Sequence, residues 1–179
     1  MKSTIIILSL VVASLGFWSC SKSNDSNPTP TKYTFSLNGN TYNQLSAADS
    51  SSSTLVSDRT VHVISVAGAS ADGKAQAQVD LIFAGSAKPA AGTYAIVDTA
   101  TALSSGNVAI FAIDRVSASK GGLYGSSKTD QKITITLNSG KYAVSIPSVP
   151  VHGVNIDNSD PKSSVYTNVT GSASGSFSE

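Results

Sequence analysis

The stretch KITITLNSGKYAVSIP, residues 132–147, predicts a β-hairpin. Apolar and polar side chains alternate on both arms, which flank the turn sequence NSGK at 138–141. Because successive side chains of a strand point to opposite faces, this alternation gives each arm one apolar face. We therefore expect two antiparallel strands that bury one face. The apolar positions of the predicted hairpin are Ile133, Ile135, Leu137, Tyr142, Val144 and Ile146.

The same period of two recurs through the body of the chain, whereas no sustained period of 3.6 residues appears there. The predicted fold is all-β: an antiparallel β-sandwich of about nine strands, with a β-barrel as the alternative. It forms one domain, residues 32–179. The further predicted strands are 32–37, 41–45, 59–68, 74–85, 93–97, 107–116 and 164–178.

Three stretches are rich in turn-forming residues and are expected to be loops. They are the serine-rich 46–58, the sequence GGLYG at 121–125, and HGVNIDNSDPK at 152–162. In 74–85, Ala75, Ala77, Val79, Leu81 and Phe83 should share one face, with Gln78 and Asp80 on the other. The segment 107–116 is apolar on both faces, which indicates a central strand.

Charge composition argues against a nucleic-acid partner. Only 13% of the residues are charged, the formal net charge is +1, and Arg59 and Arg115 are the two arginines. A nucleic-acid-binding domain normally shows a basic stripe, and this sequence has none.

The first twenty residues, MKSTIIILSLVVASLGFWSC, predict a cleaved export signal over residues 1–19. Lys2 is followed by an apolar run at 5–18, which as a helix would reach only about 21 Å. That is short for a bilayer core of about 30 Å and typical of a secretory signal peptide. Cys20, the one cysteine, ends this run.

The sequence Phe17-Trp18-Ser19-Cys20 resembles the lipobox of bacterial lipoprotein precursors, in the looser form found in Bacteroidota. The resemblance implies cleavage between Ser19 and Cys20, and a lipid, including palmitate-type acyl chains, on Cys20. Two or more acyl chains anchor a protein stably in a membrane. Residues 20–31 would then be the lipidated cysteine and a disordered linker, because this polar, proline-containing stretch cannot bury a core.

GTY at 92–94, ITIT at 133–136, SGKYAVSI at 139–146 and VTGSASGSF at 169–177 extend the likeness. They resemble small cell-envelope lipoproteins of Bacteroidota whose β-domain has no known function. The resemblance implies an envelope protein that is anchored by lipid to the outer membrane. It leaves two placements, with the domain facing either the periplasm or the cell surface. It implies no catalytic residue.

The sequence contains no recognisable catalytic or cofactor motif, and we expect a non-enzymatic protein without a cofactor. His62 and His152 are the two histidines and lack companion ligands. A glycosidase would need a carboxylate pair such as Asp80 and Asp114, which nothing in the sequence brings together. A weak calcium site remains at Asp157 and Asp160.

Three tyrosines, Tyr42, Tyr124 and Tyr166, are expected to be exposed and are candidate ligand contacts. Exposed aromatic rings are typical of glycan-binding surfaces. Asp98-Thr99-Ala100 resembles the O-glycosylation motif of Bacteroidota, which implies a glycan on Thr99. The leading expectation is a binding or structural domain. The alternatives are a glycan-binding surface lipoprotein and a docking subunit of an outer-membrane complex.

The anchor gives a direct prediction. Replacing Cys20 with alanine should abolish incorporation of a labelled palmitate analogue in the native host, because no other cysteine can take the thioether. The measurement is acyl labelling followed by immunoprecipitation, with Ser21→Ala as the matched control. Equal labelling of wild type and Cys20→Ala would contradict the lipoprotein interpretation.

Overall fold

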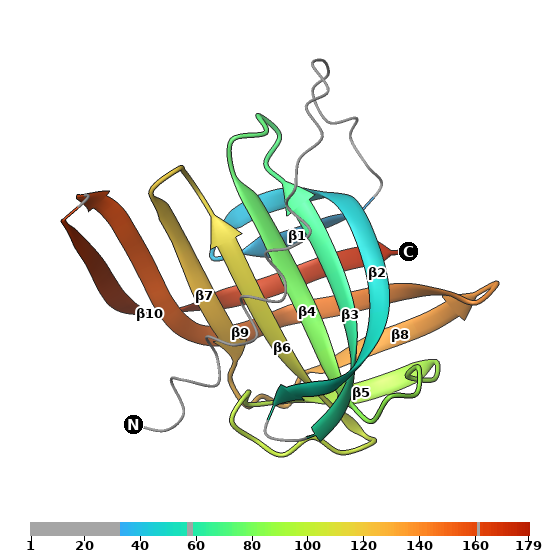
Figure 1. Ribbon diagram of the computed structural model, residues 1–179. Coiled ribbons are helices and arrows are strands. Elements are labelled where there is room, and N and C mark those ends of the chain that lie inside the picture. The colour runs from blue at the N-terminus through green and yellow to red at the C-terminus, as the bar shows by residue number, and fades with distance from the viewer. Residues whose placement is uncertain (1–32, 57–58, 161) are drawn as a thin grey trace.

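The computed structural model describes residues 33–56, 59–160 and 162–179, and these residues form ten strands (Figure 1). The predicted signal peptide, the Ser19–Cys20 cleavage site and the linker lie outside the described residues. The strands are β1 (Thr34–Leu37), β2 (Asn40–Val56), β3 (Arg59–Ala69), β4 (Gln76–Ala84), β5 (Gly92–Val97), β6 (Asn107–Arg115), β7 (Lys120–Ser126), β8 (Lys132–Asn138), β9 (Lys141–Asp160) and β10 (Ser163–Ser178).

All of the described strands belong to one sheet, in the order β10-β1-β2-β3-β4-β6-β5-β8-β9-β7. Two further pairings, β9 with β10 and β6 with β7, fold this sheet back on itself. In Figure 1, β2, β3, β4 and β6 lie in front of the parts of β9 and β10 that cross behind them. The all-β class is confirmed, and the two halves of the sheet enclose a common core.

One pair of neighbours departs from the expected antiparallel pattern. β5 and β6 run parallel, but they share only the register from Ala95↔Asn107 to Val97↔Ala109. Parallel neighbours ordinarily need a long crossover connection. Here the overlap is short enough for the loop 98–106 to carry the chain back.

The main core lies on the inner face of the curled sheet, where the alternating apolar positions meet. β4 contributes Ala77, Val79, Leu81 and Phe83, as the alternation predicted. Gln78 and Asp80 lie on the opposite face of β4, as expected, and both are buried there, with Gln78 Nε2 donating to Asp80 Oδ1 at 2.8 Å.

A second apolar cluster, on the outer face of the sheet, explains why β6 is apolar on both faces. Val61, Val63, Ile82 and Phe111 form it, and Leu103 packs against them. β6 is buried at nearly every position, so its interpretation as a central strand is confirmed.

Most of the described residues of all three predicted loops lie in strands. β2 continues through the serine-rich stretch to Val56, because residues 46–52 pair with β3. Residues 152–160 continue β9 and pair with β10 and β7. GGLYG forms the middle of β7. Serine, asparagine and glycine lower strand propensity, but the backbone hydrogen bonds of neighbouring strands override that preference.

The glycines of β7 are required by close packing. A Cβ at Gly121 would lie 2.4 Å from the Asp114 carbonyl oxygen, and a Cβ at Gly125 would lie 2.5 Å from Thr99 Oγ1. Their role is therefore close approach of neighbouring chain segments, not loop mobility.

From the position of the main core we expect alanine substitutions at two leucines to differ in their effect on the free energy of unfolding. Leu81→Ala should lower the free energy of unfolding by about 2–5 kcal/mol, because Leu81 is fully buried and the change leaves a cavity. Leu137→Ala on β8, where the side chain is 41% exposed, should cost about 0.5 kcal/mol or less. Urea unfolding of both variants measures the difference, and equal losses would contradict this assignment of the core.

Candidate functional site

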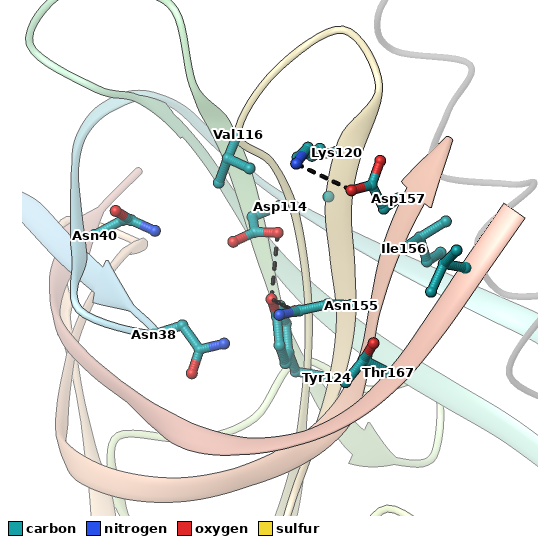
Figure 2. A pocket seen from close by; sticks show the side chains of 12 residues that line it. Asn38, Asn40, Asp114, Val116, Lys120, Tyr124, Asn155, Ile156, Asp157 and Thr167 are labelled. Atoms are coloured by element: carbon teal, nitrogen blue, oxygen red, sulfur yellow. Dashed lines mark hydrogen bonds and ion pairs between the residues drawn. The ribbon is translucent and has the colours of Figure 1, made fainter. Parts of the chain in front are cut away.

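A cavity of about 440 Å³ opens at one end of the curled sheet, between the β1–β2 turn, the β6–β7 hairpin and the β9–β10 hairpin (Figure 2). We call it the Asp114 pocket. Its lining residues are Asn38, Asn40, Asp114, Val116, Lys120, Gly121, Tyr124, Asn155, Ile156, Asp157, Val165 and Thr167. A volume of this size suits a small ligand.

The pocket forms where β10 stops pairing with β1 and the two strands diverge. β10 pairs with β9 along nearly its whole length, but with β1 only from Ala173 to Gly175. At that point the β1–β2 turn is held by the Asn38 N–H, which donates to the Ser172 carbonyl at 2.9 Å. Asn38 and Gly39 have φ values of 53° and 81°, as expected for an Asn-Gly hairpin turn. Beyond this turn the two segments diverge.

Asp114 and Tyr124 form the buried floor of the pocket. Asp114 is 5% exposed and Tyr124 is 3% exposed. The Tyr124 hydroxyl donates to Asn155 Oδ1 at 2.8 Å and lies 3.4 Å from Asp114 Oδ1. Burial raises the pKa of Asp114 to about 6, although hydrogen bonds from Tyr124, from the Gly122 N–H and from Tyr42 act in the opposite direction.

Tyr42 adds a hydroxyl beside this floor. Its ring stacks on Phe35 with the ring centroids 5.4 Å apart, and its side chain is fully buried. Burial and the charge of Asp114 raise the pKa of Tyr42. Its hydroxyl lies close to Asp114 and Asn40, although among the described residues it makes no hydrogen bond of standard geometry.

The rim of the pocket combines an ion pair with apolar side chains. Lys120 Nζ lies 3.0 Å from Asp157 Oδ2. Hydrogen bonds from Ser159 and Lys120 lower the pKa of Asp157 to about 2. Val116 and Val165 are exposed beside this pair. In Figure 2, Asn38 and Asn40 face Asn155 and Tyr124 across the opening.

The structure corrects two of the three expected ligand contacts. Tyr42 and Tyr124 were expected on the surface, but both are buried because their rings lie on the inner face with the core. Tyr166 is 65% exposed, as expected. It stands between Val165 and Thr167, which line the pocket, so its side chain lies on the other face of β10. Tyr124 still contributes to the site, as a floor residue.

The carboxylates considered in the sequence do not form paired or metal-binding sites. Asp114 lies on the inner face of β6 with Val108, Ile110 and Ala112, whereas Asp80 lies on the opposite face of β4. Asp157 pairs with Lys120, and Asp160 Oδ1 accepts the Lys162 N–H at 2.9 Å. Among the described residues, no group of three or more His, Cys, Asp or Glu side chains is placed to hold a metal ion.

A second polar cluster lies toward the opposite end of the core. His62 is buried there, with Nε2 3.3 Å from Asp49 Oδ2 and Nδ1 3.4 Å from the Ser86 carbonyl oxygen. Lys88 Nζ lies 2.9 Å from the same Asp49 oxygen, and its hydrogen bond lowers the pKa of Asp49. His152 is exposed on β9, which does not neighbour β3, so the two histidines do not meet.

Thr99 lies in the loop after β5, as the sequence predicted. Its N–H donates to the Ser126 carbonyl at 3.2 Å, and its side chain packs over Gly125. Glycosylation at Thr99 stays a prediction.

No protein-family model, curated protein or solved structure matches this chain. In the part of the chain that the structure describes, no helix has the length and apolarity needed to cross a membrane. The functional interpretation therefore depends on the geometry of the site.

Asp114 predicts a pH-dependent stability difference. Its folded-state pKa of about 6 exceeds the unfolded value of about 3.9, so the folded protein holds the proton more tightly. The stability that the carboxyl contributes therefore falls as the pH rises from about 4 to about 6 and stays low above that. Asp114→Asn should match wild type in melting temperature near pH 4 and exceed it at pH 7.

Asp157→Asn is the matched control. Because the folded-state pKa of Asp157 is lowered to about 2, its contribution is present above the unfolded pKa. That variant should be slightly less stable than wild type, by the same amount at pH 5 and pH 7. If the difference in melting temperature between Asp114→Asn and wild type were the same at pH 4 and pH 7, the buried, charged state of Asp114 would be contradicted.

Proposed function

We propose that this chain is a lipid-anchored envelope protein whose β-domain binds a small polar ligand in the Asp114 pocket, without catalysing a reaction. The observation that carries the proposal is the pocket floor. The buried carboxylate of Asp114, the buried hydroxyl of Tyr124 and three amide side chains line one cavity of about 440 Å³. Apolar cavities with a few convergent polar groups are the usual form of a ligand site.

The arrangement of the lining residues favours binding over catalysis. The floor offers one carboxylate, and the second carboxylate of the pocket, Asp157, is held by Lys120 at the rim. Acid–base hydrolysis needs two cooperating groups, and nucleophilic catalysis needs a nucleophile beside its base. Among the described lining residues, the groups present can donate and accept hydrogen bonds but form no such pair.

A saccharide is the ligand class that these groups suit best. Sugar hydroxyls both donate and accept, and the pocket presents a carboxylate, a tyrosine hydroxyl and the amides of Asn38, Asn40 and Asn155. Val116 and Val165 at the rim can pack on the C–H face of a ring. We propose accordingly that glycan binding occurs inside the pocket and not on an exposed aromatic surface.

Docking to a neighbouring membrane protein is the second candidate. β10 pairs with β1 only through Ala173–Gly175, so within the described residues its segment 163–171 has β9 as its one strand neighbour. Val165 and Tyr166 are exposed on this edge strand. An edge with free backbone groups can accept a strand of another protein.

Two tyrosine-to-phenylalanine variants distinguish pocket binding from surface binding. Tyr124→Phe removes the hydroxyl that orients Asn155, so glycan affinity should fall about tenfold, as for loss of a buried hydrogen bond. Tyr166→Phe should leave affinity unchanged, because Tyr166 lies outside the pocket. Glycan arrays find the ligand, and titration calorimetry measures both variants.

The opposite result, loss of affinity with Tyr166→Phe alone, would place binding on the exposed face of β10. Crosslinking from that face in native membranes would then test the docking candidate.

A further inference from the structure

The described residues that line the Asp114 pocket carry one more negative charge than positive charge. Its lining holds two carboxylates, Asp114 and Asp157, and one ammonium, Lys120. Lys120 is engaged by Asp157 at 3.0 Å. The ion pairs of the described residues join Asp49, Asp72 and Asp157 to lysines or to His62, and none includes Asp114.

At the opposite end of the core, another inward-facing carboxylate, that of Asp49, has a cationic partner. Asp49 lies 2.9 Å from Lys88, so its charge has a cationic partner, and His62 lies 3.3 Å away. Asp80 is the other buried carboxylate without a cation, but it accepts a hydrogen bond from Gln78 and does not line the cavity. Asp114 alone of these three lines the cavity and has no cationic partner among the described residues.

The remaining groups around Asp114 cannot balance its charge. Tyr124, Tyr42 and the Gly122 N–H give neutral hydrogen bonds to Asp114. Removing a carboxylate from water without an opposite charge is unfavourable, and a cation placed against it recovers much of that loss. A ligand bound in the open cavity can supply such a cation.

We propose that the ligand of the Asp114 pocket carries a protonated primary amine that pairs with Asp114, as in an amino sugar. This inference rests on the proposed function and names its ligand class. An ammonium group has three donors. Asp114 offers a carboxylate oxygen, and the Tyr124 hydroxyl, which lines the same cavity, offers a second acceptor oxygen beside it.

The amide groups and the rim then bind the uncharged part of the same molecule. Asn155 Oδ1 already accepts from Tyr124, so its amide N–H groups remain to donate to sugar hydroxyls. Val116 and Val165 contact the ring. Amine recognition at the floor and hydroxyl recognition above it give the pocket selectivity for amino sugars over neutral sugars.

Protonation of Asp114 should weaken this recognition. The charged and titratable groups that face the floor are Tyr42 from β2, Tyr124 from β7, and the Lys120–Asp157 pair from β7 and β9. Asp157 stays ionised down to about pH 2, so Asp114, with its pKa of about 6, is the carboxyl whose charge changes between pH 5 and pH 7.

The test compares glucosamine, glucose and N-acetylglucosamine, which share a ring but differ in charge, by titration calorimetry with the full chain in detergent. At pH 7, glucosamine should bind at least tenfold more tightly than the two neutral sugars. That preference should disappear at pH 5 and in Asp114→Asn. Asp72→Asn, a turn carboxylate paired with Lys74, is the control and should keep the preference.

The outcomes separate this inference from the proposed function. Equal affinity for glucosamine and glucose, reduced by Tyr124→Phe, would overturn the amine inference and leave saccharide binding in place. An amine preference that survives in Asp114→Asn would also overturn the inference. If no sugar binds in this assay or on a glycan array, saccharide binding fails, and the amine inference fails with it.

Discussion

Strand β9 holds the two halves of the sheet together. Along its twenty residues it pairs with β8 near Lys141–Ser145, with β7 over Val151–Asp157, and with β10 almost throughout. Without the pairings of β9, the strands β1–β6 would form an open sheet with an exposed apolar face. The inner core and the pocket at its end both depend on this one long strand. The envelope location proposed for the protein makes a core of this kind important, because with a single cysteine the chain has no internal disulfide to rely on.

The two ends of the curled sheet differ in whether an inward-facing carboxylate has a cationic partner. At one end, Asp49 is paired with Lys88 and lies beside His62, and Lys88 also lies 5.5 Å above the ring centroid of Tyr142. At the other end, the divergence of β10 from β1 leaves Asp114 facing a cavity. An inward-facing carboxylate thus has a lysine partner at one end of the core, whereas the described residues give Asp114 no cationic partner at the other.

The sequence predicted those elements whose side chains alternate strongly. The hairpin of β8 and β9, the core face of β4 and the central position of β6 all follow from the pattern of apolar residues and from turn chemistry. The serine-rich part of β2, the glycines of β7 and the far half of β9 were assigned to loops. In these segments, pairing with neighbouring strands decides the conformation, and single-sequence composition does not record which strands will be neighbours.

The site was harder to predict for the same reason. The alternation Val108, Ile110, Ala112 already places Asp114 on an inner face, so a buried carboxylate could have been inferred from the sequence. Its meeting with Tyr124 and Asn155 could not, because they come from β7 and β9: Tyr124 lies 10 residues after Asp114, and Asn155 lies 31 residues after Tyr124. Tyr42 and Tyr124 were expected to be exposed, but their rings complete the inner core.

The floor of the pocket also depends on a side chain that is missing. A Cβ at Gly122 would lie 2.1 Å from the Tyr124 hydroxyl oxygen, so the phenol can fold back over this position only because the residue is glycine. A single methyl group there would displace the hydroxyl from Asn155 without altering any charge or polar group of the site. Glycine at position 122 therefore permits the observed orientation of Tyr124. A larger residue there would displace the Tyr124 ring and so change which molecules fit the pocket.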